Sequence, residues 1–156
     1  MILKRYTIIV DADACPVKNE ILQAARKFNW DVLMVASYDH MLPEMEGARV
    51  VQVDRSDQAV DLYIANCIAE GNVLITQDFG LASIGLAKKA SVLSNRGQLF
   101  SDDNIDFLLA RRYEHAKSRQ RGKYPKGPRP LTAEDRKIFL HALTKLLNDL
   151  QENSSL

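Results

Sequence analysis

The sequence predicts an α/β fold, a single domain in which a parallel-type sheet carries helices on both faces. Three observations lead to this prediction. The 156-residue chain is 46% hydrophobic, which is enough for one sizeable core but too little for two. Short runs rich in β-branched residues alternate with longer segments of helical period. These short runs show almost no apolar-polar alternation, which is typical of strands buried on both faces.

The first strand is expected at residues 5–11, RYTIIVD, and the first helix from Pro16 to Phe28. Proline suits the first helical position because its missing N–H would have had no partner there. One face of this helix is apolar and consists of Val17, Ile21, Ala24, Ala25 and Phe28. Two further strands are expected at residues 31–37, DVLMVAS, and 48–54, ARVVQVD.

The next part of the chain continues the alternation of strands and helices. A helix over residues 57–70 is ended by Gly71, and the run NVLITQ at residues 72–77 is the next strand. A helix at residues 79–89 then leads to a short last strand at 91–94. This order implies parallel pairing with right-handed crossovers.

The last third of the chain is expected to lie outside that alternation. A short helix is predicted near residues 104–112, and a mobile basic loop at about 113–130, where breakers are frequent and no apolar period exists. Thr132 is expected to cap an amphipathic helix at about 132–150. That helix could pack on its own sheet or on a partner subunit, so a homodimer is one of the expected assemblies.

Charge is distributed unevenly along the chain. The net charge is +1, but residues 111–129 contain eight Lys or Arg and one Glu. That segment therefore carries +7, which leaves −6 for the remainder. An acidic body with a basic arm predicts an anionic partner that the body alone would repel. The simpler alternative is a solvated loop that binds nothing specific.

Several classes of protein are excluded by the composition. No apolar run approaches the roughly 20 residues that cross a bilayer, and the start MILKRYTIIV lacks the pattern of a signal peptide. Cys15 and Cys67 have neither the number nor the spacing of a disulfide framework or a zinc site. We therefore expect a cytoplasmic protein with reduced thiols and no membrane partner.

Aspartates follow three of the expected strands. Asp11 and Asp13 come after the first strand, Asp54 ends the third, and Asp78 comes after the fourth. In open α/β sheets the ligand crevice lies beyond the carboxyl ends of the strands. We therefore expect side chains that are far apart in the sequence to converge at this edge of the sheet.

The helix after the third strand adds Asp57 and Asp61. At about 100° per residue, Asp61 lies about 40° from Asp57 around the helix axis. The apolar Ile64 and Ile68 lie within about 20° of Asp57. Both carboxylates are therefore predicted on the apolar side of the helix, where a solvated charge would not normally point. The apolar Leu62 lies on the opposite side and weakens this interpretation.

Each acid also has a simple structural explanation. Asp57 could be a first-turn carboxylate favoured by the helix dipole, and Asp78 could be an N-cap. Asp13 could accept hydrogen bonds from the helix expected at Pro16. Asp61 fits such an explanation least well, because it is a second-turn acid on the core side.

Taken together, the acids predict a metal site. Converging carboxylates raise one another's pKa values unless a cation neutralises them. Carboxylates without clustered His or Cys prefer hard ions, so Mg²⁺ or Mn²⁺ is the expected cofactor. Such an ion activates water and bridges phosphate oxygens, which makes phosphodiester or phosphomonoester hydrolysis the leading chemistry. The predicted metal ligands are Asp11, Asp13, Asp57, Asp61 and Asp78, and all of these except Asp57 are also the predicted catalytic residues.

Basic and aromatic residues are expected to hold a phosphate-bearing polyanion. In the basic loop the candidates are Lys117, Arg119, Arg121 and Lys123, while Tyr113 and Tyr124 could stack on unpaired bases. Lys18, in the first turn of the first helix, could pair with one of the acids or reach a phosphate. The neighbouring Cys15 is expected to be a packing or capping residue, because nearby carboxylates oppose formation of its thiolate.

Four segments of the sequence resemble one known family. These are DADACPVKNEI near the N-terminus, VLITQDFGLA in the middle, NRG at residues 95–97 and GPRPLTAEDRKIF near the end. Together they resemble the YaiI/YqxD family of bacterial proteins over nearly the whole chain. That family is similar to PIN-like and NYN-type domains. The resemblance implies a PIN-like three-layer α/β/α fold with acids clustered around Mg²⁺ or Mn²⁺, and RNA cleavage.

Individual residues match the motifs of that family. Asp11 and Asp13 match its DADAC block, and Asp78 matches the acid after its ITxD strand. Asp61 matches one of two adjacent acids in a helix, but Val60 replaces the other, which makes a second metal less expected. Arg96 matches an RG dipeptide, where it could contact phosphate or could simply be a surface turn residue.

Two rival interpretations remain open. The Asp11-x-Asp13 pattern is also found in haloacid-dehalogenase-type phosphatases, with Asp11 as nucleophile, Asp13 as general acid and Thr76 binding phosphate. However, the residues that usually follow this pattern are replaced by Cys15-Pro16. The other rival is a non-catalytic RNA-binding module, in which the acids are structural or bind one ion.

Overall fold

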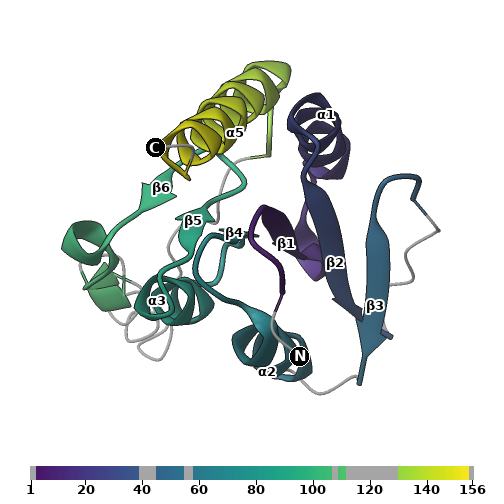
Figure 1. The fold of residues 1–156 in the computed structure, drawn as a ribbon. Coiled ribbons are helices and arrows are strands. Elements are labelled where there is room, and N and C mark those ends of the chain that lie inside the picture. Colours follow the sequence, from purple (N-terminus) through teal and green to yellow (C-terminus); the bar gives the residue numbers. More distant parts are fainter. Residues whose placement is uncertain (1–2, 39–44, 55–57, 107–108, 112–129, 155–156) are drawn as a thin grey trace.

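A six-stranded sheet forms the centre of the molecule (Figure 1). The structure is a computed structural model and describes residues 3–38, 45–54, 58–106, 109–111 and 130–154. The strand order is β3-β2-β1-β4-β5-β6, and only the last pairing is antiparallel. The strands are β1 (Thr7–Asp11), β2 (Asp31–Ser37), β3 (Arg49–Val53), β4 (Val73–Ile75), β5 (Ser91–Leu93) and β6 (Leu99–Phe100).

Helices cover both faces of the sheet, as Figure 1 shows, so the predicted three-layer α/β/α fold is confirmed. α1 (Lys18–Phe28) and α5 (Ala133–Ser154) lie on one face, and α2 (Ala59–Cys67) and α3 (Phe79–Ala87) lie on the other. Along β1 the side chains alternate between the two cores. Ile8 and Val10 pack under α1 and α5, whereas Ile9 packs under α2 and α3.

The order of the strands reverses at the centre of the sheet. From β1 the chain passes through α1 to β2 on one side, and from β4 it passes through α3 to β5 on the other. The two helices lie on opposite faces, so the two crossovers have the same hand. β1 and β4 are neighbours, and the carboxyl ends of these two strands form the topological switch point of the sheet.

Some boundaries differ from the sequence prediction. The first helix begins at Lys18 and not at Pro16, because Cys15 is extended (φ −102°, ψ 109°), as favoured before proline, and Val17 is not yet helical (φ −113°, ψ 29°). A short 3₁₀ helix, η1 (Ala12–Ala14), follows β1 and was not predicted.

The strand at residues 91–94 was predicted to be the last, and that prediction is wrong. β6 follows it and pairs antiparallel with β5, because the turn through Ser94 and Gly97 folds the chain back. Gly97 has a φ of +83°, which only glycine adopts without strain. The helix predicted at 57–70 spans Ala59–Cys67 in α2, within the described residues.

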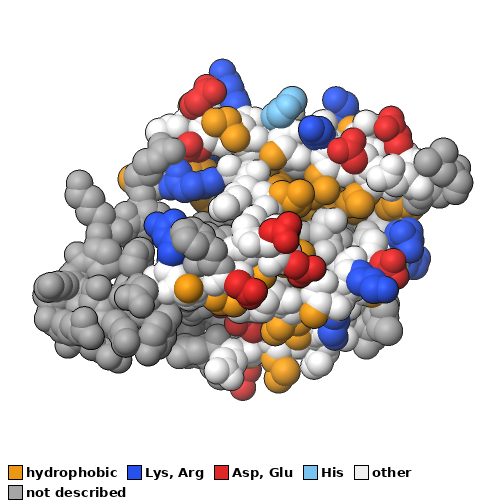
Figure 2. All heavy atoms as spheres, turned by 90° about the vertical axis from the view of Figure 1, so that its left-hand side faces the viewer, with side chains coloured by type: hydrophobic (Ala, Val, Ile, Leu, Met, Phe, Trp, Pro, Cys, Tyr) orange, Lys and Arg blue, Asp and Glu red, His pale blue; other side chains and the backbone are white. Residues whose placement is uncertain are grey.

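The C-terminal helix α5 packs mainly on its own sheet. Phe139, Leu143 and Leu147 are fully buried in the core with α1. A groove of about 240 Å³ with a largely apolar lining remains between this helix and the β5–β6 turn. Figure 2 shows hydrophobic side chains lying in a band across this side of the molecule. The expected homodimer stays a prediction.

Within the described residues, no helix is long and apolar enough to span a bilayer.

Candidate acidic site at the sheet edge

Asp11, at the end of β1, is bonded to the strand beside it. The register pairs Val10 with Ile75, so the next residues, Asp11 and Thr76, are also neighbours. The Thr76 hydroxyl donates a 2.9 Å hydrogen bond to Oδ2 of Asp11. By strand alternation Asp11 lies on the same face as Ile9, which packs under α2 and α3. The Asp11 carboxylate is therefore held on the α2–α3 side of the switch point.

Asp13 fixes the segment after β1 to the end of β2. Its Oδ1 accepts a 2.8 Å hydrogen bond from the backbone N–H of Ser37, the last residue of β2. This bond orients the carboxylate and satisfies a backbone donor that the strand ladder no longer uses. Asp13 thus lies between the carboxyl ends of β1 and β2.

Asp78 is the N-cap of α3, so the simple explanation predicted for it is confirmed. Its Oδ1 accepts a 3.0 Å hydrogen bond from the N–H of Leu81, and its own N–H donates to the Thr76 hydroxyl at 3.0 Å. The hydroxyl of Thr76, a residue only 1% exposed, therefore joins Asp11 to Asp78. We refer to Asp11, Asp13 and Asp78 as the acidic edge.

The electrostatics of Asp11 reflect this convergence. Burial raises the pKa of the Asp11 carboxyl above its ordinary value, the hydrogen bond from Thr76 lowers the pKa, and the negative charges of Asp13 and Asp78 raise it further. The net result is a raised pKa. The negative charges of Asp13 and Asp78 therefore act on the Asp11 carboxyl at this edge.

Asp61 lies in the first turn of α2 and not in the second turn that was predicted, because the helix begins at Ala59. It is half-buried, whereas its neighbour Leu62 is 63% exposed. Asp61 and Asp78 line the same open pocket between α2 and α3, which measures about 330 Å³. The pocket is lined by Gln58, Asp61, Leu62, Ala65, Asp78, Gly80, Leu81 and Ile84.

Any metal ion at the acidic edge would have to be bound by no more than two of its carboxylates. Among the described residues, no group of three or more His, Cys, Asp or Glu side chains is close enough to hold an ion. Mg²⁺ is commonly bound through one or two carboxylates and several waters. The carboxylates of Asp11, Asp13 and Asp78 are oxygen ligands of the type that Mg²⁺ and Mn²⁺ prefer.

Cys15 and Lys18 lie next to the acidic edge at the start of α1. Burial raises the pKa of the Cys15 thiol to about 11, so the thiol is protonated at neutral pH. This agrees with the expected packing role for Cys15. The Lys18 ammonium donates a 3.0 Å hydrogen bond to the carbonyl oxygen of Cys15. The bond fixes the end of the lysine side chain close to the turn that follows η1.

Arg96 is held by the C-terminal helix. Its guanidinium forms an ion pair of 3.1 Å with Oδ2 of Asp135, a residue in the first turn of α5 that is 7% exposed. The same carboxylate accepts a 3.0 Å hydrogen bond from the N–H of Thr132, and the Thr132 hydroxyl accepts one of 3.1 Å from the N–H of Asp135. The cap predicted at Thr132 is confirmed, and its charged partner Arg96 comes from the β5–β6 turn.

Two partners of the acids are not predicted by the sequence. The sequence predicts Ser37 only as the end of a strand, and Thr76 only as a phosphate-binding group in the phosphatase alternative. The available signal for Thr76 was its position, because a residue with a hydroxyl group follows the strand directly and stands two residues before Asp78. No comparable signal existed for Ser37, because its role depends on a backbone N–H. The remaining predicted residues, Asp57, Lys117, Arg119, Arg121 and Lys123, lie outside the described residues.

The fold and this edge define a class of protein, a doubly wound α/β domain with interacting carboxylates at its topological switch point. Comparison with known families extends this description. Residues 9–149 match the family described as "Uncharacterized BCR, YaiI/YqxD family". The chain belongs to the YaiI/YqxD family, as its motifs predicted.

Individual relatives cover nearly all of the chain. A UPF0178 protein of Listeria monocytogenes is 45% identical over 142 residues, which is 91% of this chain and 97% of the relative. A UPF0178 protein of Bacillus pumilus is 45% identical over 146 residues, 92% of this chain and 87% of the relative. A UPF0178 protein of Halalkalibacterium halodurans is 44% identical over 144 residues, 92% of each chain. No solved structure gives a significant match.

Proposed function

We propose that this protein is a phosphodiesterase that depends on Mg²⁺ or Mn²⁺ and cleaves RNA at the acidic edge. The observation that supports this most directly is the raised pKa of Asp11 at the switch point, which is caused first by burial and increased by the negative charges of Asp13 and Asp78. Perturbed carboxylates in such a crevice are more frequent at functional sites than at structural ones. A cation would relieve the repulsion, and a phosphodiester would then be able to approach.

The proposed roles follow from the hydrogen bonds of each residue. Asp11 and Asp78 would hold the cation, since the Thr76 hydroxyl orients the Asp11 carboxylate and the N–H of Leu81 orients the Asp78 carboxylate. Asp13, fixed by the N–H of Ser37, would not bind the ion directly but would accept hydrogen bonds from its water ligands on the β2 side. When bound, the ion would supply Lewis acidity toward a phosphate oxygen and lower the pKa of a water.

Asp61 and the pocket that it shares with Asp78 would contribute to substrate positioning. The pocket of about 330 Å³ opens beside the acidic edge and is bordered by apolar residues of α2 and α3. A nucleotide next to the scissile phosphate would therefore contact Leu62 and Ile84, both of which are exposed. Lys18 and the basic loop would supply cations for the remaining phosphates.

Two observations argue against nucleophilic alternatives. The Thr76 hydroxyl donates to Asp11 and accepts from the N–H of Asp78, so it is engaged in the fold and not oriented toward a phosphate. This weakens the phosphatase alternative, in which Asp11 attacks phosphorus. The Cys15 thiol, with its pKa raised to about 11, is a poor nucleophile at neutral pH.

The proposal is tested by incubating the purified full chain with 5′-labelled single-stranded RNA and Mn²⁺ or Mg²⁺. We expect cleavage that is lost on chelation and reduced at least about a hundredfold in Asp11→Asn and Asp78→Asn, since removing one key electrostatic group typically costs this much. Asp149→Asn, which changes an exposed acid on α5, is the matched control and should cleave normally.

The alternatives give different results in the same experiment. RNA binding without cleavage under any divalent ion would instead favour the non-catalytic module. A covalent adduct of Asp11 with a fluoride phosphate mimic, together with hydrolysis of phosphomonoesters, would favour the phosphatase. Cleavage that persists in both aspartate variants would place the activity elsewhere or in a contaminant, and the proposal would fail.

A further inference from the structure

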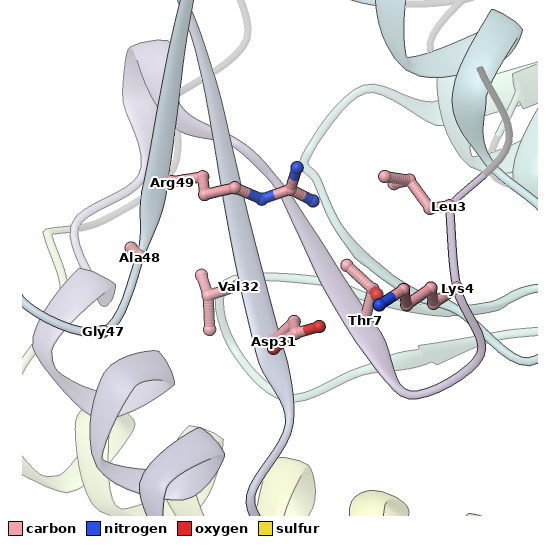
Figure 3. A pocket seen from close by; sticks show the side chains of 8 residues that line it. All are labelled: Leu3, Lys4, Thr7, Asp31, Val32, Gly47, Ala48 and Arg49. Atoms are coloured by element: carbon pink, nitrogen blue, oxygen red, sulfur yellow. The ribbon is translucent and has the colours of Figure 1, made fainter.

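A second pocket lies at the opposite edge of the sheet, where the strands begin (Figure 3). Its volume is about 530 Å³, within the range of small-molecule sites. Four strand steps separate Thr7 from Asp11, so this pocket lies about 13 Å from the acidic edge along β1. It is lined by Leu3, Lys4, Thr7, Asp31, Val32, Gly47, Ala48 and Arg49.

The strand register brings the polar lining residues together. Thr7 of β1 pairs with Asp31 of β2, and Leu33, two residues further along β2, pairs with Arg49 of β3. Alternate residues of a strand share a face, so Thr7, Asp31 and Arg49 all lie on the α2–α3 face of the sheet. The three side chains are therefore neighbours because of the fold, although they are distant in the sequence.

Two cations extend into this pocket from different segments. Figure 3 shows the Arg49 side chain reaching from β3 toward Leu3, and the Lys4 side chain reaching toward Thr7. Among the described residues, no ion pair is seen for Lys4, Arg49 or Asp31. The pocket thus presents two positive charges and one negative charge that form no ion pair with the residues the structure describes.

The rest of the lining offers apolar surface and open backbone. Leu3 and Val32 are buried side chains on its walls. Gly47 has a φ of +89°, and a Cβ placed on it would meet no atom within 4 Å, so its backbone borders empty space. A ligand can therefore approach the chain directly at this turn.

We propose that this pocket binds a small phosphate monoester that also carries hydroxyl groups, such as a sugar phosphate. Arg49 and Lys4 would hold the phosphate, because a guanidinium and an ammonium are the usual partners of this group. Asp31 would repel a bare anion, but its carboxylate would accept a hydrogen bond from a hydroxyl of the same ligand. The requirement for both groups distinguishes this pocket from a nonspecific basic patch.

The probes are ribose 5-phosphate, inorganic phosphate and ribose, each titrated into the full chain and followed by calorimetry and by ¹H–¹⁵N spectra. Ribose 5-phosphate should bind more tightly than either of the others and shift the resonances of Thr7, Gly47 and Arg49. Arg49→Gln and Lys4→Gln should each weaken its binding about tenfold, the usual scale for one charge-assisted hydrogen bond. Lys137→Gln, at an exposed position on α5, is the matched control and should bind as the wild type does.

Asp31→Asn tests the second part of the proposal. The variant should bind inorganic phosphate more tightly than the wild type does. The ratio of its affinity for ribose 5-phosphate to its affinity for inorganic phosphate should therefore be smaller. Equal binding of the two phosphates to the wild type would overturn the proposal, as would unchanged affinity in both cation variants or shifts confined to other residues. The acidic edge is intact in all these variants, so the outcome is independent of the proposed nuclease activity.

Discussion

The Thr76 hydroxyl and the Asp11 carboxylate are joined by a 2.9 Å hydrogen bond across the β1–β4 pair. The same hydroxyl accepts a bond from the N–H of Asp78, so one buried side chain connects the two strand ends that meet at the switch point. The arrangement of the acidic edge therefore depends on a neutral residue, and this dependence can be measured.

Replacing Thr76 by valine should destabilise the protein by about 1–3 kcal/mol, because the Asp11 carboxylate and the N–H of Asp78 lose a buried partner while the side-chain volume is retained. The pKa of Asp11 should rise further, since the bond from Thr76 lowers it. Denaturant unfolding measures the first effect. Thr76→Ser keeps the hydroxyl and is the control, and a valine variant as stable as the serine variant would contradict the prediction.

Replacing Asp11 by asparagine should stabilise the metal-free protein at neutral pH. The raised pKa of Asp11 means that the folded state holds its proton more strongly than the unfolded state does. As pH rises through the ordinary pKa of about 4, the unfolded state ionises first, so stability falls until the folded carboxyl has also ionised. The loss of stability caused by Asp11 is complete above the pKa that its carboxyl has in the folded state, and it is absent below the pKa that the carboxyl has in the unfolded state.

The free energy of unfolding of Asp11→Asn should therefore be higher than that of the wild type near pH 7, and the two values should be almost equal near pH 3. Thermal unfolding of both proteins over this range measures it. Added Mg²⁺ or Mn²⁺ should stabilise the wild type more than the variant, because only the wild type offers the full set of carboxylates. A variant that is less stable than the wild type at neutral pH without metal would contradict the argument.

Cys15 should react slowly with iodoacetamide at neutral pH. Its pKa of about 11 leaves very little thiolate, and the residue is only 5% exposed. Alkylation followed by peptide mapping separates Cys15 from Cys67. The same shift predicts a loss of stability as pH rises from 9 toward 11, where the unfolded thiol ionises before the folded one. Rapid labelling of the native protein at Cys15 would refute this description of the thiol.

Removing the Asp135 carboxylate should loosen the start of α5. Asp135→Ala deletes the acceptor for the N–H of Thr132 and leaves Arg96 without this ion-pair partner, which should cost about 1–3 kcal/mol. The neighbouring exposed Glu134 provides the control, and Glu134→Ala should change the free energy of unfolding by less than about 0.5 kcal/mol. Equal changes in the free energy of unfolding for the two substitutions would contradict this prediction.

Much of the fold could be predicted because its signals are local. The apolar runs of β1, β2 and β4 and the alternation with helices were sufficient for a parallel sheet with three layers. The turn back into β6 could not be foreseen in the same way, because a two-residue strand has too few residues to show a period. The start of α1 was misplaced for a different reason, since Pro16 is compatible with both a turn and a first helical position.

The candidate site was predictable only as a set of residues. The positions of Asp11, Asp13 and Asp78 after strands were sufficient to place them at one edge, and besides burial the charges of Asp13 and Asp78 raise the pKa of Asp11. The orientation of these side chains depends on hydrogen bonds between segments far apart in the chain, such as that from the N–H of Ser37 to Asp13. No pattern in the sequence predicts such bonds. Asp61 shows the same limit, because its helical angle predicted partial burial but not the pocket that it shares with Asp78.

The sequence by itself determined most of the strands and helices, though not β6 or η1, and it determined which acids follow the strands, because periodicity and chain order can be read from it directly. The tertiary structure alone decided that Thr76 joins Asp11 to Asp78, that Arg96 pairs with Asp135, and that Thr7, Asp31 and Arg49 surround one pocket. The physical reason is that each of these contacts depends on strand register and layer packing, which are set by the whole core and not by any single segment.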